Sequence, residues 1–122
     1  MTRILVIEDN VRNRYLISFI LKGDGFEVIE AITGEDGVEM ALKERPDVVL
    51  MDIQLPGIDG YEATRRIRAL PEGKDVPIIA LTSYAMTGDR EKALAAGCTG
   101  YIEKPLNPDT ILDEIRSFMR SG

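Results

Sequence analysis

Two of the apolar runs in this chain are followed by acidic side chains that could share one site. Glu8 and Asp9 come directly after one run, and Asp52 comes directly after another. Carboxylates that meet repel one another and raise one another's pKa, and a hard divalent cation removes that conflict. Mg²⁺ and Mn²⁺ both prefer such oxygen ligands. If these carboxylates meet in the fold, they predict a site for one of these ions.

Two further apolar runs end in a hydroxyl pair and an ammonium. Thr82 and Ser83 follow one run, and Lys104 follows the other, just before Pro105. A lysine offers a point positive charge to a phosphate and a hydroxyl offers a hydrogen bond, while an aspartate can act as a covalent nucleophile. Carboxylates, hydroxyl and ammonium together therefore indicate a site for a phosphoryl group.

Each of these side chains also has an ordinary structural interpretation. The alternatives are helix caps for Asp9 or Asn10 and for Thr82 or Ser83, a turn residue for Asp52, strand packing for Tyr101 and a solvated charge for Lys104. The signal is their joint occurrence at the ends of four different apolar runs.

The elements that must position these residues alternate along the chain. Apolar runs predict strands over 4–7, 26–29, 48–51, 78–81 and 101–102, and helical patterns predict helices over 10–22, 34–44, 60–69, 86–96 and 107–120. Such alternation predicts an α/β fold with parallel strands and helices on both faces of the sheet. In such a sheet, functional groups gather beyond the carboxyl ends of the strands.

Three of these elements carry further local predictions. Glu27 interrupts the second run and predicts an edge strand. In the last helix, Asn107 is the expected N-cap and Pro108 the first helical residue. Met86 and Leu94 are the only large apolar residues within 86–96, which predicts a weakly anchored helix.

Composition excludes several classes of protein. The chain has 122 residues with 15 Lys+Arg, 21 Asp+Glu, no histidine and one cysteine, Cys98. The missing histidine excludes a Ser-His-Asp triad and His-ligated zinc, and a single cysteine excludes an internal disulfide. No apolar run approaches the roughly 18 residues of a membrane span. We therefore expect one cytoplasmic domain over 1–122, acting neither on membranes nor, because of its net negative charge, on nucleic acids.

The quoted residues resemble the receiver domain of two-component response regulators over essentially the whole chain. The motifs are Ile-Glu-Asp-Asn at 7–10, Leu-Met-Asp-Ile-Gln-Leu-Pro-Gly-Ile-Asp-Gly at 50–60, Leu-Thr-Ser at 81–83 and Lys-Pro at 104–105. The chain is most similar to stand-alone receivers of the cell-division type and to receivers of hybrid kinases. The resemblance implies a flavodoxin-like doubly wound (βα)5 fold, with a five-stranded parallel sheet in the order 2-1-3-4-5.

The resemblance also implies a phosphoacceptor and a metal site. Asp52 would take a phosphoryl group from the phosphohistidine of a histidine kinase or a histidine phosphotransfer protein. Asp9 and Asp52 would bind Mg²⁺ or Mn²⁺ directly, together with the backbone carbonyl of Gln54, and Glu8 would hold a metal-bound water.

By the same resemblance, other residues would sense the phosphoryl group. Lys104 would contact it, Thr82 would hydrogen-bond it, and Ser83 would offer its backbone N–H. Tyr101 would be an aromatic switch that turns inward as Thr82 moves, and Pro105 would follow a cis peptide bond. The helix over 86–96, the strand of Tyr101 and the last helix would form the face that regulates a downstream protein.

Two predictions concern the surroundings of the pocket. Gln54 and Tyr84, each two residues beyond a site residue, should flank the phosphoryl group, and the bulk of Tyr84 should slow hydrolysis of the aspartyl phosphate. In the first helix, Leu16, Ile17, Ile20 and Leu21 form the expected core stripe, and a second stripe consists of Val11, Tyr15 and Phe19. The second stripe either packs against the last helix or docks a partner's helices.

Other functions compete with that of a phosphoacceptor that only phosphorylates and dephosphorylates itself. A Mg²⁺-dependent phosphohydrolase using Asp52 usually needs an acid two residues later, where this chain has Gln54. A flavin-binding module needs a phosphate-cradling loop after the first strand, where Glu8 and Asp9 would repel a phosphate. A receiver-like interaction module that is never phosphorylated is a further alternative. No output domain is expected.

Overall fold

A parallel five-stranded sheet in the order β2-β1-β3-β4-β5 forms the centre of the computed structural model, which describes residues 2–83 and 88–119. The strands are β1 (Arg3–Ile7), β2 (Glu27–Ala31), β3 (Val48–Asp52), β4 (Ile78–Thr82) and β5 (Gly100–Glu103). The order confirms the flavodoxin-like prediction. The second strand lies at an edge, as Glu27 indicated, and this glutamate is exposed there.

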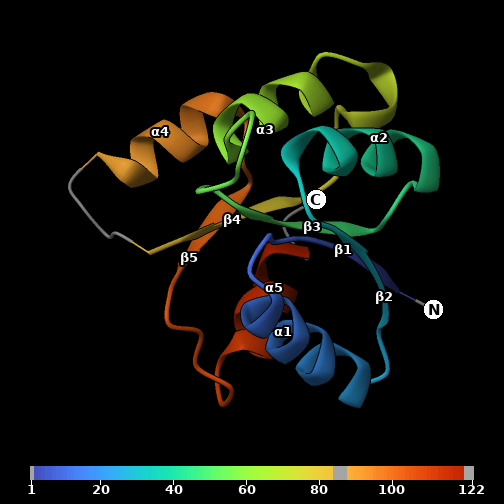
Figure 1. Ribbon diagram of the computed structural model, residues 1–122, viewed down its shortest axis with the longest axis vertical. Helices are drawn as coiled ribbons and strands as arrows, with labels where there is room; N and C mark the ends of the chain where they lie inside the picture. Colours follow the sequence, from blue (N-terminus) through green and yellow to red (C-terminus); the bar gives the residue numbers. More distant parts are fainter. Residues whose placement is uncertain (1, 84–87, 120–122) are drawn as a thin grey trace.

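Helices cover both faces of the sheet. One layer contains α1 (Val11–Gly23) and α5 (Ile111–Met119), and the other contains α2 (Gly34–Glu44), α3 (Gly60–Arg68) and α4 (Asp89–Ala96) (Figure 1). A short 3-10 turn, η1 (Pro71–Gly73), follows α3. Polar caps set the starts of three helices, because the side chains of Asn10, Thr33 and Asp59 each accept a backbone N–H three residues later.

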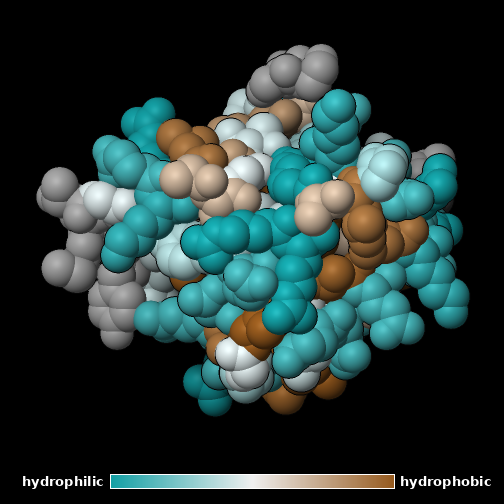
Figure 2. Space-filling model, turned by 90° about the horizontal axis from the view of Figure 1, so that it is seen from above, coloured by the Kyte–Doolittle hydropathy of each residue, from teal (hydrophilic) through white to brown (hydrophobic). Residues whose placement is uncertain are grey.

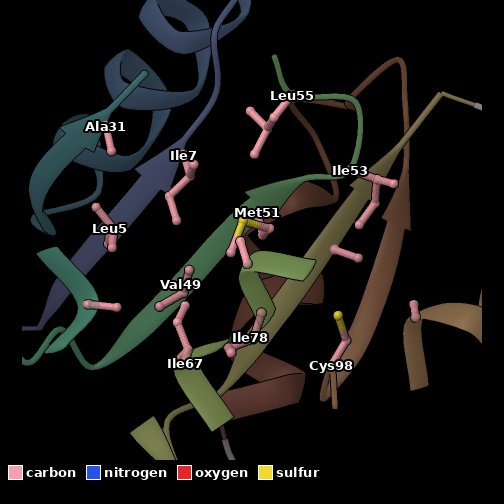
Figure 3. Close-up of a cluster of buried hydrophobic side chains, with 14 residues drawn as sticks. Leu5, Ile7, Ala31, Val49, Met51, Ile53, Leu55, Ile67, Ile78 and Cys98 are labelled. Atoms are coloured by element: carbon pink, nitrogen blue, oxygen red, sulfur yellow. The ribbon is translucent and has the colours of Figure 1, made fainter. Parts of the chain in front are cut away.

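Two hydrophobic cores lie on the two faces of the sheet. Along β1, Leu5 and Ile7 belong to the core beneath α2, α3 and α4, whereas Ile4 and Val6 belong to the core beneath α1 and α5. Figure 3 shows the first of these cores, with Leu5, Ile7 and Met51 among its members. Both faces of the central strands are therefore buried, which explains why their sequences are apolar at every position except one end residue of each strand.

Polar side chains dominate the outer surface of one helix layer. Figure 2 shows the face above α2, α3 and α4, which is largely hydrophilic with a few hydrophobic patches. On α3, exposed Arg65 and Arg66 both pair with Glu62, while Ala63 and Ile67 are buried against the sheet. This helix is thus amphipathic, as expected of a helix that lies on a sheet. In the described parts of the chain, residues 2–83 and 88–119, no helix is both long and apolar enough to cross a membrane.

The last helix begins later than predicted. Regular α5 starts at Ile111, and Asn107 and Pro108 lie in the turn before it. Asn107 Oδ1 accepts the Asp109 N–H at 2.9 Å, and the Asn107 carbonyl accepts the Ile111 N–H at 2.9 Å. Asn107 therefore makes the hydrogen bonds expected of an N-cap, because the first N–H groups of a helix have no acceptor within it, although the regular helix begins only at Ile111.

The core stripe predicted for α1 is partly wrong. Ile17 and Leu21 are buried, but Leu16 is 42% exposed. The second stripe, Val11, Tyr15 and Phe19, is 66–71% exposed, so the interpretation that it packs against α5 is also wrong. At about 100° per residue, Tyr15 and Phe19 lie roughly 160° around the helix from the buried Ile17. The outer side of α1 therefore carries an apolar surface, on which the rings of Tyr15 and Phe19 stack.

Small residues hold α4 against the sheet. Ala93 and Ala96 are buried, whereas Leu94, one of the two large apolar residues of the prediction, is 46% exposed. Met86, the other, lies outside the described residues. The helix thus buries methyl groups and no large side chain within residues 90–96.

Candidate functional site

Three carboxylates meet at the carboxyl ends of β1 and β3. One ligand oxygen from each of Glu8, Asp9 and Asp52 can be chosen so that all three lie within 4.8 Å of one another. The two strands are neighbours in the sheet, with Ile7 opposite Met51, so the residues that follow them lie side by side. Glu8 and Asp52 are buried, and Asp9 is exposed, which leaves the cluster open to solvent on the side of Asp9.

The ammonium of Lys104 lies between two of these carboxylates. Lys104 Nζ is 2.7 Å from Glu8 Oε1 and 3.3 Å from Asp52 Oδ2. Lys104 follows β5, and its backbone N–H donates to the Thr82 carbonyl at 2.7 Å, which extends the β4–β5 ladder to this edge. The Lys104–Pro105 peptide bond is cis.

The other predicted site residues lie at the same edge or close to it. Thr82 ends β4 and is buried, and Ser83 follows it and is exposed. Gln54 follows Asp52, and its backbone N–H donates to Asp52 Oδ1 at 3.1 Å. Tyr101 is half-buried on β5 and packs against the core under α2, α3 and α4. Tyr84 lies outside the described residues.

Glycine at position 60 lets α3 begin against the end of β3. The Gly60 N–H donates to the Ile53 carbonyl at 2.9 Å. A Cβ at this position would lie 2.5 Å from the Asp52 carbonyl oxygen and 2.8 Å from Ile53 Cα. The start of α3 thus lies close against the end of β3. A larger residue at position 60 would require the backbone to move.

Burial and the neighbouring carboxylate determine the charge of the site. Burial raises the pKa of Asp52 to about 7, the hydrogen bond and charge of Glu8 act in the same direction, and Lys104 opposes them. Burial alone would also raise the pKa of Glu8, but its hydrogen bond to Asp52 and the ammonium of Lys104 outweigh this, so the pKa lies below its usual range. The cluster therefore shares a proton near neutral pH, with Glu8 as the ionised partner of Lys104.

The donor set of this cluster fits a hard divalent cation. Its side-chain ligands are carboxylate oxygens alone, and three of them can approach a single ion. One ammonium cannot neutralise three carboxylates, so negative charge is left over once Asp52 ionises. Oxygen-only sets of this kind suit Mg²⁺ or Mn²⁺ and disfavour the softer metals that need nitrogen or sulfur.

One contact of the site was missed in the sequence. Arg14 Nη1 donates to the Glu8 carbonyl at 2.8 Å, and its side chain is only 15% exposed. An arginine in the first turns of a helix is usually solvated, so its residue type and spacing carried no signal.

Comparison with known proteins identifies relatives of the whole chain. The family described as the response regulator receiver domain matches residues 4–116. The polar-differentiation response regulator DivK of Brucella anthropi is 35% identical over 116 residues, which cover 95% of this chain and 94% of that protein.

Solved structures of similar fold include proteins from bacteria and yeast. The receiver domain of sensor histidine kinase PA1611 from Pseudomonas aeruginosa, with a magnesium ion coordinated in its active site cleft, has a TM-score of 0.90 and 40% identity over 98% of each chain. A chain in the co-crystal of the Saccharomyces cerevisiae histidine phosphotransfer protein Ypd1 with the receiver domain of its downstream response regulator Ssk1 has a TM-score of 0.89 and 29% identity. It covers 98% of this chain and 89% of its own length.

Proposed function

The chain belongs to the response regulator receiver domain family, and we propose that Asp52 is its phosphoacceptor. Receivers are the phosphoacceptors of two-component signalling. The observation that carries the assignment is the position of Lys104 Nζ, 3.3 Å from Asp52 Oδ2 beside the cluster of three carboxylates. A nucleophilic carboxylate, a cation for the phosphoryl oxygens and a set of metal ligands lie together only here among the described residues.

The reaction is transfer of a phosphoryl group from a partner's phosphohistidine. An Asp52 carboxylate oxygen attacks phosphorus, the new P–O bond forms, and the P–N bond breaks with its electron pair going to the imidazole. Lys104 pairs with a phosphoryl oxygen, the Thr82 hydroxyl hydrogen-bonds another, and Ser83 offers its backbone N–H. Because burial favours the protonated form of Asp52, the carboxyl group must lose this proton before transfer.

A divalent ion completes this site. Asp9, Asp52 and the backbone carbonyl of Gln54 would hold Mg²⁺ or Mn²⁺ directly, and Glu8 would hold it through a water. When bound, the ion neutralises charge on the phosphoryl oxygens. The carboxylate cluster at the end of β1 and β3 supports this assignment.

Phosphorylation acts on a downstream protein through the face formed by α4, β5 and α5. Thr82 ends β4 beside the acceptor, and Tyr101 lies on the neighbouring strand, with Ala80 as its pairing partner. Movement of Thr82 toward the phosphoryl group would let Tyr101 turn inward, and α4, anchored by small side chains, can follow at low cost.

The phosphodonor docks on α1. Val11, Tyr15 and Phe19 form an exposed apolar stripe on this helix, which begins two residues after Asp9. Beside it, a cavity of about 400 Å³ opens between α1 and the segment after β5, lined by Leu16, Lys104 and Leu106 among others. We assign the stripe to helices of a histidine kinase or histidine phosphotransfer protein, because Lys104 lines both the cavity and the phosphoryl site.

Incubation with acetyl phosphate and Mg²⁺ tests the acceptor. We expect a mass gain of one phosphoryl group on the wild-type chain, lost on treatment with hydroxylamine, and no gain on Asp52→Asn. Asp113→Asn, an exposed acid on α5, is the matched control and should be phosphorylated normally. A phosphoryl adduct that survives Asp52→Asn would contradict the assignment.

A phosphohydrolase would behave differently in the same experiment. The chain should catalyse only its own phosphorylation and dephosphorylation, so release of inorganic phosphate from p-nitrophenyl phosphate should stay at background. Sustained turnover of that ester, abolished by Asp52→Asn, would favour the hydrolase instead.

We place the protein in the cytoplasm, where its single free cysteine, Cys98, stays reduced.

A further inference from the structure

Arg14 holds the backbone of the turn that carries two of the proposed metal-binding residues. Its Nη1 donates to the Glu8 carbonyl at 2.8 Å and lies 3.4 Å from the Asp9 carbonyl. The turn joins β1 to α1 and is only three residues long, 8–10. A single guanidinium nitrogen carries two N–H groups and can donate to two successive carbonyls, which fixes the orientation of both peptide planes.

Two N–H groups of the same turn donate to acceptors of their own. The Glu8 N–H donates to the Ala31 carbonyl at 3.1 Å, and the Asn10 N–H donates to Glu8 Oε2 at 3.3 Å. Asn10 also caps α1 through the Asn13 N–H. These bonds hold one side of the turn, so the contacts of Arg14 hold the carbonyl side.

The edge strand β2 in turn holds Arg14 through Glu30. Glu30 Oε1 lies 3.9 Å from Arg14 Nε, and Glu30 Oε2 accepts a hydrogen bond of 2.5 Å from Ser18 Oγ. Ser18 is 4% exposed on the side of α1 that faces the sheet, and a hydroxyl buried there needs a partner. Glu30 therefore serves two residues of α1 at once.

From these contacts we propose that Arg14 is a positioning residue for the metal site, held by Glu30 and Ser18. It orients the Glu8–Asp9 backbone so that both carboxylates face Asp52, and its positive charge offsets part of their mutual repulsion before an ion binds. The proposal rests on the proposed function, because it takes Glu8 and Asp9 as metal-binding residues.

Titration with Mn²⁺, followed by the electron paramagnetic resonance signal of the free ion, measures this role directly and without phosphorylation. Loss of groups that orient metal ligands costs affinity, and for Arg14→Gln we expect about five- to tenfold weaker Mn²⁺ binding. Arg14→Lys, which keeps the charge and one donor nitrogen, should recover part of the loss. Arg12→Gln removes the same charge from an exposed position of α1, and we expect a change within about twofold because exposed charges are screened.

A second readout uses the metal-free chain. Amide hydrogen exchange at Asp9 and Asn10 should be faster in Arg14→Gln than in Arg12→Gln, and Glu30→Gln should show a smaller increase in the same direction. Thermal unfolding of each variant verifies that the comparison is made between folded proteins.

The outcomes separate this proposal from the metal site on which it rests. Equal Mn²⁺ affinity and equal amide exchange in Arg14→Gln and Arg12→Gln would overturn the role of Arg14 while leaving the site intact. If Asp9→Asn binds Mn²⁺ as tightly as the wild type, the metal site itself is wrong, and the proposal falls with it.

Discussion

Lys104 Nζ lies 2.7 Å from Glu8 Oε1, although the two residues are 96 positions apart in the chain. The same ammonium is 3.3 Å from Asp52 Oδ2. Glu8 is fully buried and the Lys104 side chain is 14% exposed, so the pair lies where water screens poorly. The Lys104 ammonium thus supplies the positive charge that pairs with both buried carboxylates.

Replacing Lys104 should destabilise the metal-free chain. Lys104→Met keeps the apolar stem but leaves two buried carboxylates without their cation, and we expect a loss of about 2–4 kcal/mol in the free energy of unfolding at pH 8. Urea unfolding without metal measures this. The control Lys43→Met removes an exposed lysine of α2. Equal losses in the two variants would mean that the buried pairing contributes nothing specific.

Stability of the metal-free chain should fall as the pH rises from 5 to 8. Burial raises the pKa of Asp52 to about 7 from an ordinary value of 3.8, so the folded chain retains a proton that the unfolded chain releases. The resulting stabilisation is complete below the unfolded pKa and is lost as the pH rises through 7, by on the order of 1–3 kcal/mol between pH 5 and 8. The pKa of Glu8 is lowered, so its contribution to the free energy of unfolding changes only at more acidic pH. Urea unfolding at several pH values measures the slope, and Asp52→Asn should flatten it; a slope unchanged by this substitution would assign the proton elsewhere.

The apolar stripe of α1 should matter for the protein donor and not for a small one. We expect Tyr15→Ala with Phe19→Ala to slow transfer from a phosphorylated histidine phosphotransfer protein by about tenfold or more. Phosphorylation by acetyl phosphate should be unchanged, and unfolding free energy should change by less than about 0.5 kcal/mol because both rings are exposed. Leu70→Ala, an exposed leucine after α3, is the matched control. A similar slowing with acetyl phosphate would argue for damage to the pocket.

Tyr84 should lengthen the lifetime of the phosphorylated state. It follows Thr82 by two residues, and its bulk should hinder the water that attacks the aspartyl phosphate. We expect several-fold faster loss of phosphate from Tyr84→Ala, measured by mass spectrometry after removal of acetyl phosphate. Tyr84→Phe keeps the ring and should retain the wild-type lifetime. If Tyr84→Ala loses phosphate no faster than the wild type, the steric explanation is wrong.

A methyl group at position 60 should disturb the acceptor. In Gly60→Ala the new Cβ would meet the Asp52 carbonyl oxygen at 2.5 Å, and backbone cannot move aside as a side-chain tip can. We expect a loss of about 1–3 kcal/mol in unfolding free energy, together with slower phosphorylation by acetyl phosphate. Gly23→Ala, with no atom within 4 Å of its Cβ, is the control and should be tolerated. Normal phosphorylation of Gly60→Ala would show that the α3 start can shift without moving Asp52.

Much of the fold and of the site could be predicted because the signals are local. Apolar runs show where buried strands lie, and side chains such as Asn10 show where helices begin. The grouping of Glu8, Asp9, Asp52 and Lys104 also followed, since parallel strands end at one edge of the sheet. The prediction for α2 has the observed bounds, Gly34–Glu44.

The errors concern the rotation of helices on the sheet and contacts between distant elements. The stripe of Val11, Tyr15 and Phe19 is apolar whether it packs against α5 or faces outward. Only the packing of α1 on the sheet decides that it faces outward. The start of α5 is a smaller difference: Asn107 makes the capping bonds that its residue type indicated, but the regular helix begins at Ile111.

The amino-acid sequence by itself determined the order of elements, the chemistry available at the sheet edge and the family, because these depend on residue types and short-range spacing. Only the tertiary structure decided that Lys104 pairs with Glu8 as well as Asp52, and that Arg14, Ser18 and Glu30 support the first turn. The contacts of Lys104 join residues far apart in the chain, and those of Arg14 and Ser18 join neighbouring elements, so the geometry of both depends on how the strands and helices pack.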